Sequence, residues 1–597
     1  MSNPIYISQL AFTTGEVSPD VSSRFDLEQY KSALLEAENV VIRPYGAVAK
    51  RQGSQYVGQV KYSDKPTRLF EFTTNTNNSF MLEFGEKYIR VWNYGVYTGI
   101  EVTTPFTSDI LFDLNCSQSG DVMFICSGKY PIQTLSRYSD TDWRLEAYKL
   151  TEQPYDNINT DVKATVTVTS DIVQSSTNMF NADMVGMVMQ LGYFVSAVHI
   201  KSTGTVVEKK EKRTHFSGVH KWNEYNNINY NVESYSTDQD LAWKFTTHGT
   251  WTGTVKLQIT TNNGTTWKDY RTYSSNNDYN VTDAGKIEPN AKLRIQSDIK
   301  SGECNVDLSI LPYTTWGIIE FKEFVDAKTM KINILNGIVE NEATSKWKMG
   351  SWGRSNGYPK LCTFYQDRFV VAATNKNPNY IWMSRTGDYP NFGVEKVEGT
   401  ITDDSSITLP VINRKMYEIR HLVPANDLII LTSGNEWIVS GDKTITPTNC
   451  NLKTQTQRGA LSCEPQFIGN RCVFVQERGG TVRDMGYSYE SDNYTGQDLT
   501  LFVKTRVRGY LTITSAYAQD PDSIIYYIRN DGEINCLTYI PEQKVYGWSH
   551  FVTNGKYLYC ESVSEGEQDS LYTLVERTLQ GKKVKCIERM VPLYSDD

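Results

Sequence analysis

The chain has 597 residues, of which 39% are hydrophobic and 22% are charged. These proportions are typical of a globular protein with substantial cores, and they argue against a disordered or membrane-embedded chain. The formal net charge of −9 argues against tight binding of DNA, because such binding depends on cations that neutralise phosphates. A protein that encloses DNA and lets it slide past is compatible with this charge.

The aromatic content predicts the fold class. The chain contains 38 Tyr, 22 Phe and 12 Trp, together with many Thr, Asn and Gly. Tyr, Phe, Trp and Thr favour pleated sheet, and Asn and Gly favour the turns between strands. We therefore expect an all-β protein.

The ten cysteines are scattered and include no C-x-x-C pair. This pattern favours buried, unpaired thiols in a protein that folds in a reducing cytoplasm. The first residues, MSNPIYISQL, do not have the pattern of a signal peptide, and no apolar run is long enough to span a membrane. We expect synthesis in the cytoplasm, no membrane anchor, no metal and no cofactor.

Residues 1–60 are predicted to form a docking arm with a short helix. Asp26 is expected to cap this helix, with Gln29 completing a capping box. An apolar stripe then follows at helical spacing, and Pro44 and Gly46 break the chain into a turn. The stretch carries no catalytic pattern and is typical of a segment that docks onto a surface.

Short strands and tight turns follow, as in a β-propeller or a β-sandwich. Residues 61–154 are expected to form the first blades, and residues 321–597 the remaining blades and the C-terminal segment. Between them, residues 155–320 are richer in Asn, Thr and Ser, and we interpret them as an inserted β-sandwich-like module. The spacing shows no clear internal repeat and does not fix the number of blades.

Three local patterns could carry function. Thr260–Trp267 resembles an Asp-box turn, with Asn262, Gly264 and Trp267 at the structural positions; exposed Trp251 or Trp267 could alternatively stack on a sugar. A basic tip could contact DNA or an acidic neighbour, but a solvated hairpin tip is the more common explanation, because interleaved glutamates weaken the field. The tip comprises Lys209, Lys210, Lys212 and Arg213. Asp403 and Asp404 could suggest glycoside hydrolysis but are expected to lie in a surface loop.

Several segments, in this order along the chain, resemble the nozzle proteins of short-tailed bacteriophages, also called tail tubular protein B or packaged-DNA stabilisation proteins. In the N-terminal part the matching residues are Gly15–Pro19, Arg24, Asp26, Tyr45-Gly46 and Lys50–Gly53. The residues of the arm that we expect to serve structure or assembly are Gly15, Pro19, Arg24, Asp26, Pro44, Gly46, Arg51 and Gly53. In the second half they include Gln366–Arg368, Ser384–Asp388, Leu431–Trp437, Thr446-Pro447, Asn530–Gly532 and Gly547-Trp548. The sequence departs from the family at Thr14 and at Gln52, where a glycine and a proline are usual; Gln52 is expected to loosen its turn slightly.

The resemblance implies a β-propeller with inserted β-domains, assembled as a ring that forms the distal tube of a virion tail. It implies a homo-oligomer of six copies and contact with a tail adaptor (tail tubular protein A-like) ring. It also implies contact with tail fibres or receptor-binding proteins and transient, non-specific contact with phage DNA in the lumen. It gives no catalytic residues.

An alternative function is a propeller-based receptor-binding or glycan-processing tail protein. Glycan binding or depolymerase activity would favour that alternative, and a ring with an open bore would favour the nozzle.

Overall fold

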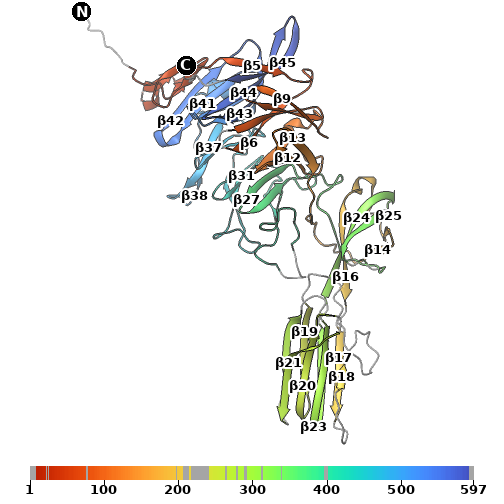
Figure 1. Cartoon of the computed structure of the whole chain (residues 1–597). Helices are drawn as coiled ribbons and strands as arrows, with labels where there is room; N and C mark the ends of the chain where they lie inside the picture. The colour runs from red at the N-terminus through yellow and green to blue at the C-terminus, as the bar shows by residue number, and fades with distance from the viewer. Residues whose placement is uncertain are drawn as a thin grey trace, which may run out of the picture. The chain divides into compact units, whose positions relative to one another are not determined.

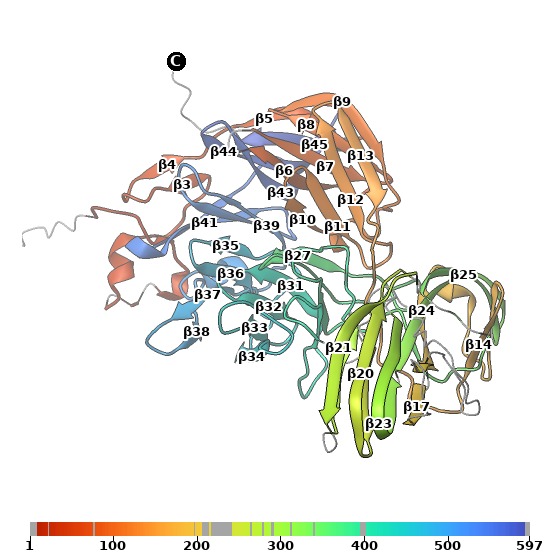
Figure 2. The ribbon, with the colours of Figure 1, turned by 60° about the horizontal axis from the view of Figure 1, so that its bottom comes forward.

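The computed structural model describes residues 9–590 apart from 22, 25, 76–77, 196–197, 206–213, 217–240, 263–264, 277–279, 288–291, 311–312, 338, 340 and 395–400. The chain divides into two compact units. Unit 1 comprises residues 1–151, 356–392 and 406–597, and unit 2 comprises residues 152–355 and 393–405. Figures 1 and 2 show the strands of both units.

Unit 1 is built from groups of four antiparallel strands, seven of them in the described residues, which we call blades I to VII. Blades II to V are separate four-stranded sheets, blade VI is extended by two strands of the arm, and blades I and VII are joined at Glu565 and Asn78 into one sheet. Blade I contains β6 (Arg68–Asn75), β7 (Asn78–Gly85), β8 (Tyr88–Asn93) and β9 (Val96–Thr103). Blade II contains β10 (Asn115–Ser119), β11 (Val122–Cys126), β12 (Gln133–Ser139) and β13 (Asp142–Ala147). Blade III contains β27 (Leu361–Tyr365), β28 (Arg368–Ala372), β29 (Tyr380–Met383) and β30 (Ile407–Pro410).

The remaining blades continue in chain order. Blade IV contains β31 (Ile419–Pro424), β32 (Leu428–Thr432), β33 (Glu436–Ser440) and β34 (Asn451–Thr456), and blade V contains β35 (Gln466–Ile468), β36 (Arg471–Val475), β37 (Val482–Ser488) and β38 (Asn493–Thr495). Blade VI contains β39 (Thr512–Ala518), β40 (Ile524–Arg529), β41 (Ile534–Ile540) and β42 (Val545–Phe551). Blade VII contains β43 (Lys556–Glu565), β44 (Gln568–Leu579), β45 (Lys582–Met590) and β5 (Ser54–Gln59).

The blades close into a propeller, because apolar side chains pack across every boundary between neighbours. The Phe80 and Trp143 rings meet between blades I and II, and the Phe124 and Phe369 rings meet between blades II and III. At every other boundary one buried cluster contains residues of both blades: Leu69 and Leu574 (VII and I), Val370 and Ile430 (III and IV), Ile429 and Phe474 (IV and V), Val473 and Ile525 (V and VI), and Ile528 and Val575 (VI and VII). Inner strands such as β40 are therefore buried on both faces, whereas β9 at a blade's outer edge is largely exposed. The expected β-propeller class is confirmed.

Strand β5 completes blade VII and so closes the ring. It pairs antiparallel with β45, from Ser54 opposite Met590 to Gln59 opposite Cys586. Residues 54–59 therefore belong to a blade and not to the arm, which had been expected to extend to residue 60. The two ends of the chain share one sheet, and this gives the ring a closure that depends on backbone hydrogen bonds.

The arm before β5 is largely irregular. It contains β1 (Gly15–Glu16), β2 (Ala33–Leu34), β3 (Val40–Ile42), β4 (Val48–Lys50) and two 3₁₀ turns, η1 (Pro19–Val21) and η2 (Glu28–Ser32). The predicted helix is thus a single short 3₁₀ turn, and Asp26 does not cap it: Leu27 occupies the N-cap and makes no side-chain cap bond. Both carboxylate oxygens of Asp26 instead accept hydrogen bonds from Arg24, at 2.8 and 2.7 Å.

Three further short elements belong to unit 1, and one of them is the single α-helix among the described residues. They are η3 (Leu111–Asp113), α1 (Lys504–Val507) and η5 (Pro541–Gln543). No helix of the described chain is both long enough and apolar enough to cross a membrane.

The larger part of unit 2, residues 152–355, is inserted between β13 and β27, and residues 393–405 lie between β29 and β30. The unit contains two sheets. The first comprises β14 (Val166–Thr169), β15 (Ile172–Ser175), β16 (Val188–Val195), β24 (Tyr313–Asp326), β25 (Thr329–Gly337) and β26 (Trp347–Met349), with η4 (Ala182–Met184) beside it. The second comprises β17 (Val198–Thr205), β18 (Thr214–Phe216), β19 (Leu241–His248), β20 (Trp251–Thr260), β21 (Lys268–Asn276), β22 (Thr282–Ile287) and β23 (Lys292–Ile310). The insertion runs to residue 355 and not to 320, because β24 pairs with β16 and β26 pairs with the same strand.

The long strand β23 organises the second sheet. Residues 292–302 pair with β20, and residues 303–310 pair with β17 and β19. Trp243 and Phe245 of β19 and Val255 and Leu257 of β20 belong to one buried cluster, so the two parts of the sheet enclose a common core.

Candidate assembly site on the N-terminal arm

The arm docks on β42, the outer strand of blade VI, through β1. Gly15 pairs in parallel with Trp548, and β2 pairs with β1 on its other side. Gly15 has φ +67°, and a Cβ at this position would lie 2.2 Å from the carbonyl oxygen of Trp548. Only glycine fits this approach, both for its backbone conformation and for space.

Glu16 is the centre of the docking site. Its buried carboxylate accepts hydrogen bonds from Arg506 Nε at 2.5 Å, from His550 Nδ1 at 2.7 Å and from the backbone N–H of Ala37 at 3.1 Å. Burial acts to raise the pKa of Glu16, but the hydrogen bonds from His550 and Arg506 outweigh it and lower the pKa to about 2. One ionised side chain thereby joins α1, β42 and two parts of the arm.

The two ring nitrogens of His550 have different hydrogen-bonding roles. Its Nε2 lies 2.8 Å from a terminal nitrogen of Arg506, and a guanidinium can only donate. Nε2 therefore accepts, and Nδ1 donates to Glu16. This assignment follows from the donors and acceptors around the ring.

Further bonds fix the arm on either side of Glu16. Ser18 N donates to the Phe502 carbonyl at 2.7 Å, and the hydroxyls of Ser18 and Thr505 lie 2.9 Å apart. At the far end, Arg51 donates to Asn39 Oδ1 at 2.7 Å and to the Val552 carbonyl at 3.3 Å. Since only residues 51–53 separate β4 from β5, the arm docks on the propeller to which it is joined.

The predicted assembly residues are distributed along this docked arm. Gly15 and Arg51 make the contacts described above, Pro19 begins η1, and Arg24 and Asp26 form an exposed ion pair. Pro44 and Gly46 lie in a turn in which Gly46 N donates to the Arg43 carbonyl at 3.0 Å. A Cβ on Gly53 would meet no atom within 4 Å, so space does not require glycine there.

Sequence reasoning did not single out the residues that meet the arm. Arg506 and His550 lie 490 and 534 positions from Glu16. The only local signal was the position of Glu16 inside the Gly-Glu-Val-Ser-Pro segment.

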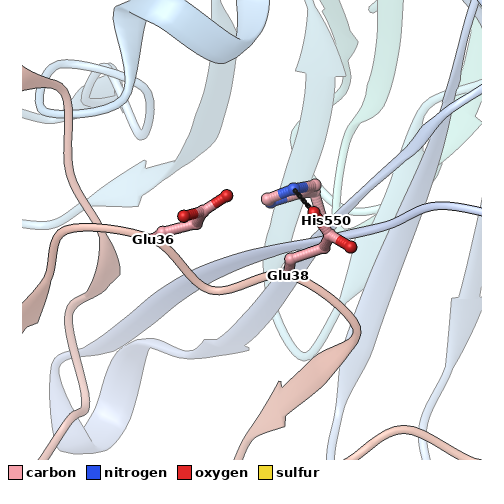
Figure 3. A group of neighbouring side chains, drawn as sticks. All are labelled: Glu36, Glu38 and His550. Atoms are coloured by element: carbon pink, nitrogen blue, oxygen red, sulfur yellow. Dashed lines mark ion pairs between the residues drawn. The ribbon is translucent and has the colours of Figure 1, made fainter.

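Glu36, Glu38 and His550 are the residues in the described chain that could together hold a metal ion, since their ligand atoms lie within 4.8 Å of one another. Figure 3 shows the two carboxylates on either side of the imidazole. However, Glu16 and Arg506 already engage both ring nitrogens. A metal would have to displace the Arg506 guanidinium to reach the lone pair of Nε2, so the arrangement does not fit a metal ion.

The predicted sites in unit 2 differ in outcome. Asn262 Oδ1 accepts hydrogen bonds from Thr266 N at 2.9 Å and from the Thr260 hydroxyl at 2.8 Å, and Trp267 is half-buried. Gly264 and the basic tip Lys209, Lys210, Lys212 and Arg213 lie outside the described residues. Trp251 is fully buried and cannot stack on a sugar, which removes one of the two aromatic platforms considered above.

The other segments that carry the resemblance form turns and buried contacts within blades III to VI. Arg368 is buried and donates to the Ser384 carbonyl at 2.8 Å, and Gln366 Oε1 accepts from Ile445 N at 2.7 Å. Asn435 Oδ1 accepts from the Thr432 hydroxyl at 2.6 Å and from Trp437 Nε1 at 2.8 Å. Gly547-Trp548 lies where the arm docks.

Residues 360–576 match the family model described as bacteriophage nozzle protein. This part of the chain is similar to the bacteriophage nozzle proteins. The match covers blades III to VI and part of blade VII, and it confirms the resemblance to the nozzle family. The match supports the interpretation that this protein is a structural component of a phage tail.

Comparison with solved structures finds WD40 proteins at low similarity. U3-55K matches at 9% identity with a TM-score of 0.26, covering 47% of this chain and 77% of that one. The WD40 repeats of RRP9 match at 10% identity, a TM-score of 0.26 and the same coverage. The C-terminal WD40 domain of Sif2 matches at 9% identity and a TM-score of 0.22, covering 47% and 92%. No curated protein matches the sequence.

Proposed function

We propose that this protein is a structural virion protein that forms the distal tail tube, or nozzle, through which phage DNA is retained and then ejected. The observation that carries the proposal is the family match over residues 360–576. The residues of the resemblance outside the match, including Gly15 and Arg51, belong to the docked arm of the same propeller.

The chemistry of the described residues supports a structural role and not catalysis. The polar groups that sequence analysis and structure single out, such as Glu16, Arg368 and Asn435, make hydrogen bonds within the propeller or between the arm and the propeller. The net charge of −9 supports a passage role, because a wall that lacks excess cations does not hold a duplex at each phosphate.

The proposed assembly is a ring of six copies in the virion tail, made from chains synthesised in the host cytoplasm. One face of the ring would dock on a tail adaptor ring, and its sides would contact tail fibres or receptor-binding proteins. DNA would touch the lumen transiently and without sequence preference.

Two measurements test this function. Phage particles made without this protein are expected to have truncated tails and to lose their genome, as measured by electron microscopy and by encapsidated DNA. Negative-stain images of tails with the protein are expected to show a ring with an open bore at the distal end. Full-length tails that retain DNA without the protein would refute the proposal, and hydrolysis of a sugar polymer by the pure protein would favour a glycan-processing tail protein.

A further inference from the structure

A short loop of the propeller exposes two cations between two apolar side chains. This cationic loop, residues 411–418, joins β30 of blade III to β31 of blade IV. Ile412 and Met416 are 73% and 74% exposed, and Arg414 and Lys415 between them are exposed as well. In the part of the chain that the structure describes, neither cation has an ion-pair partner, and exposed apolar side chains of this size carry a cost in water that a partner would relieve.

The base of the cationic loop is fixed. Val411 N donates to the Asn379 carbonyl at 2.8 Å, and Ile419 N donates to the Pro378 carbonyl at 3.0 Å. The Tyr417 ring occupies the space over Gly434, where a Cβ would lie 2.3 Å from the ring. A loop held at both ends presents its tip with little loss of conformational entropy on binding.

A second surface on the same unit has the complementary character. We call residues 35–38 of the docked arm the acidic strip: Leu35 is 78% exposed, Glu36 and Glu38 are exposed, and Ala37 between them is buried. The strip is held on β42, because His550 N donates to the Ala37 carbonyl at 3.0 Å and Asn39 N donates to the His550 carbonyl at 2.7 Å. Figure 3 shows the two carboxylates on either side of the His550 ring.

The acidic strip has no lysine or arginine partner among the described residues. Glu38 lies 3.9 Å from Nε2 of His550, but that nitrogen accepts from Arg506. Two neighbouring carboxylates beside an exposed leucine therefore match a partner that offers two cations beside an apolar side chain.

We propose that the cationic loop of one copy binds the acidic strip of the neighbouring copy in the ring. Arg414 and Lys415 pair with Glu36 and Glu38, and Ile412 or Met416 covers Leu35. Because the two surfaces differ, the contact is heterologous and closes into a ring when the rotation between copies allows it. The inference rests on the proposed function, since it names the neighbour of each copy in the tail tube.

The placement of the two surfaces in the propeller fits a small ring. The cationic loop lies at the boundary of blades III and IV and the acidic strip lies on blade VI, two and a half blades away, which is about 130° around the axis of a seven-bladed propeller. In a six-membered ring the two contact faces of a subunit are about 120° apart. In a seven-membered ring the angle is about 129°, so the placement suits a ring of six or seven copies whose propeller axes run parallel to the ring axis.

Charge reversal with mixing tests the contact. The loop variant carries Arg414→Glu and Lys415→Glu, and the strip variant carries Glu36→Lys and Glu38→Lys. Each variant alone is expected to lose the rings formed by the wild-type protein, as measured by light scattering and negative stain, because like charges then face each other. An equimolar mixture is expected to recover rings in which the two variants alternate. The matched control, Lys443→Glu with Lys453→Glu, reverses two exposed cations of blade IV and should form rings as the wild type does.

The outcomes separate this inference from the function on which it rests. Rings formed by either variant alone would overturn the inference. A mixture that stays monomeric would also overturn it, provided that both variants have the melting temperature of the wild type. A loop variant that keeps its rings but loses binding to double-stranded DNA would assign the loop to DNA instead. If lysines at 36 and 38 unfold the arm, Glu36→Gln with Glu38→Gln is expected to weaken ring formation at least tenfold. A wild-type protein that forms no ring in solution or in isolated tails would contradict the proposed function itself.

Discussion

At the scale of single residues, the docking of the arm depends on the absence of one Cβ and on the ionisation of one carboxylate. Gly15 allows β1 to approach the backbone of Trp548, and this places the neighbouring Glu16 beside His550 and Arg506. Gly15 and Gly53 look alike in the sequence, since both belong to the segment that resembles the nozzle family. The structure distinguishes them, because only Gly15 has a crowded environment and a positive φ.

We predict that Gly15→Ala lowers the free energy of unfolding by about 1–3 kcal/mol, because alanine is strained at φ +67° and its Cβ would overlap the Trp548 carbonyl. Urea denaturation and proteolysis of the arm measure the effect. Gly53→Ala is the matched control and should change stability by less than about 0.5 kcal/mol. Equal effects of the two substitutions would contradict the role assigned to Gly15.

At the scale of elements, the arm and the closing strand have different tasks. Strand β5 completes blade VII by pairing with β45, whereas β1 and β2 extend blade VI from outside. Sequence patterns predicted that both segments dock, but they assigned residues 54–59 to the arm. The pairing partner of a strand lies far away in sequence, so local patterns do not reveal it.

The docking of the arm should depend on pH through Glu16. Its pKa is lowered from 4.5 to about 2 in the folded protein, so its ionised form stabilises the fold above pH 4.5, and this stabilisation is lost as the pH falls towards 2. The loss has an upper limit of roughly 3 kcal/mol. Between pH 7 and pH 3, the wild type is expected to lose more unfolding free energy than Glu16→Gln in urea titrations. Asp26→Asn, in an exposed pair, should keep the pH dependence of the wild type; identical curves for Glu16→Gln and the wild type would show that Glu16 does not hold the arm.

At the scale of the whole molecule, the chain consists of a closed ring of blades interrupted by one inserted unit. The segment that enters unit 2 near residue 155 and the segment that leaves it near residue 350 run antiparallel to each other. Asp156 N donates to the Met349 carbonyl at 2.8 Å, and Ser351 N donates to the Pro154 carbonyl at 2.9 Å. The insertion therefore interrupts the order of blades along the sequence without opening the ring. This explains why no repeat was evident in the sequence.

We predict that residues 157–348, which make up most of unit 2, can be removed without unfolding the propeller. Replacement of residues 157–348 by Asn-Gly joins the two antiparallel strands through a two-residue turn. The shortened chain should remain monodisperse and unfold in one cooperative transition in calorimetry, because every boundary between blades is retained. An aggregated product, or a broad transition without a heat-absorption peak, would show that the propeller needs unit 2 to fold.

The sequence by itself determined the all-β class, the strand-and-turn texture, the presence of an insertion and the relation to the nozzle family. These depend on residue types and short spacings, which act locally. Only the tertiary structure decided the seven blades, the closure by β5, the end of the insertion at residue 355 and the partners of Glu16. Each of these depends on which strands and side chains meet across hundreds of residues, as Glu16 and His550 do over 534 positions, and such pairings are selected by packing of the whole ring.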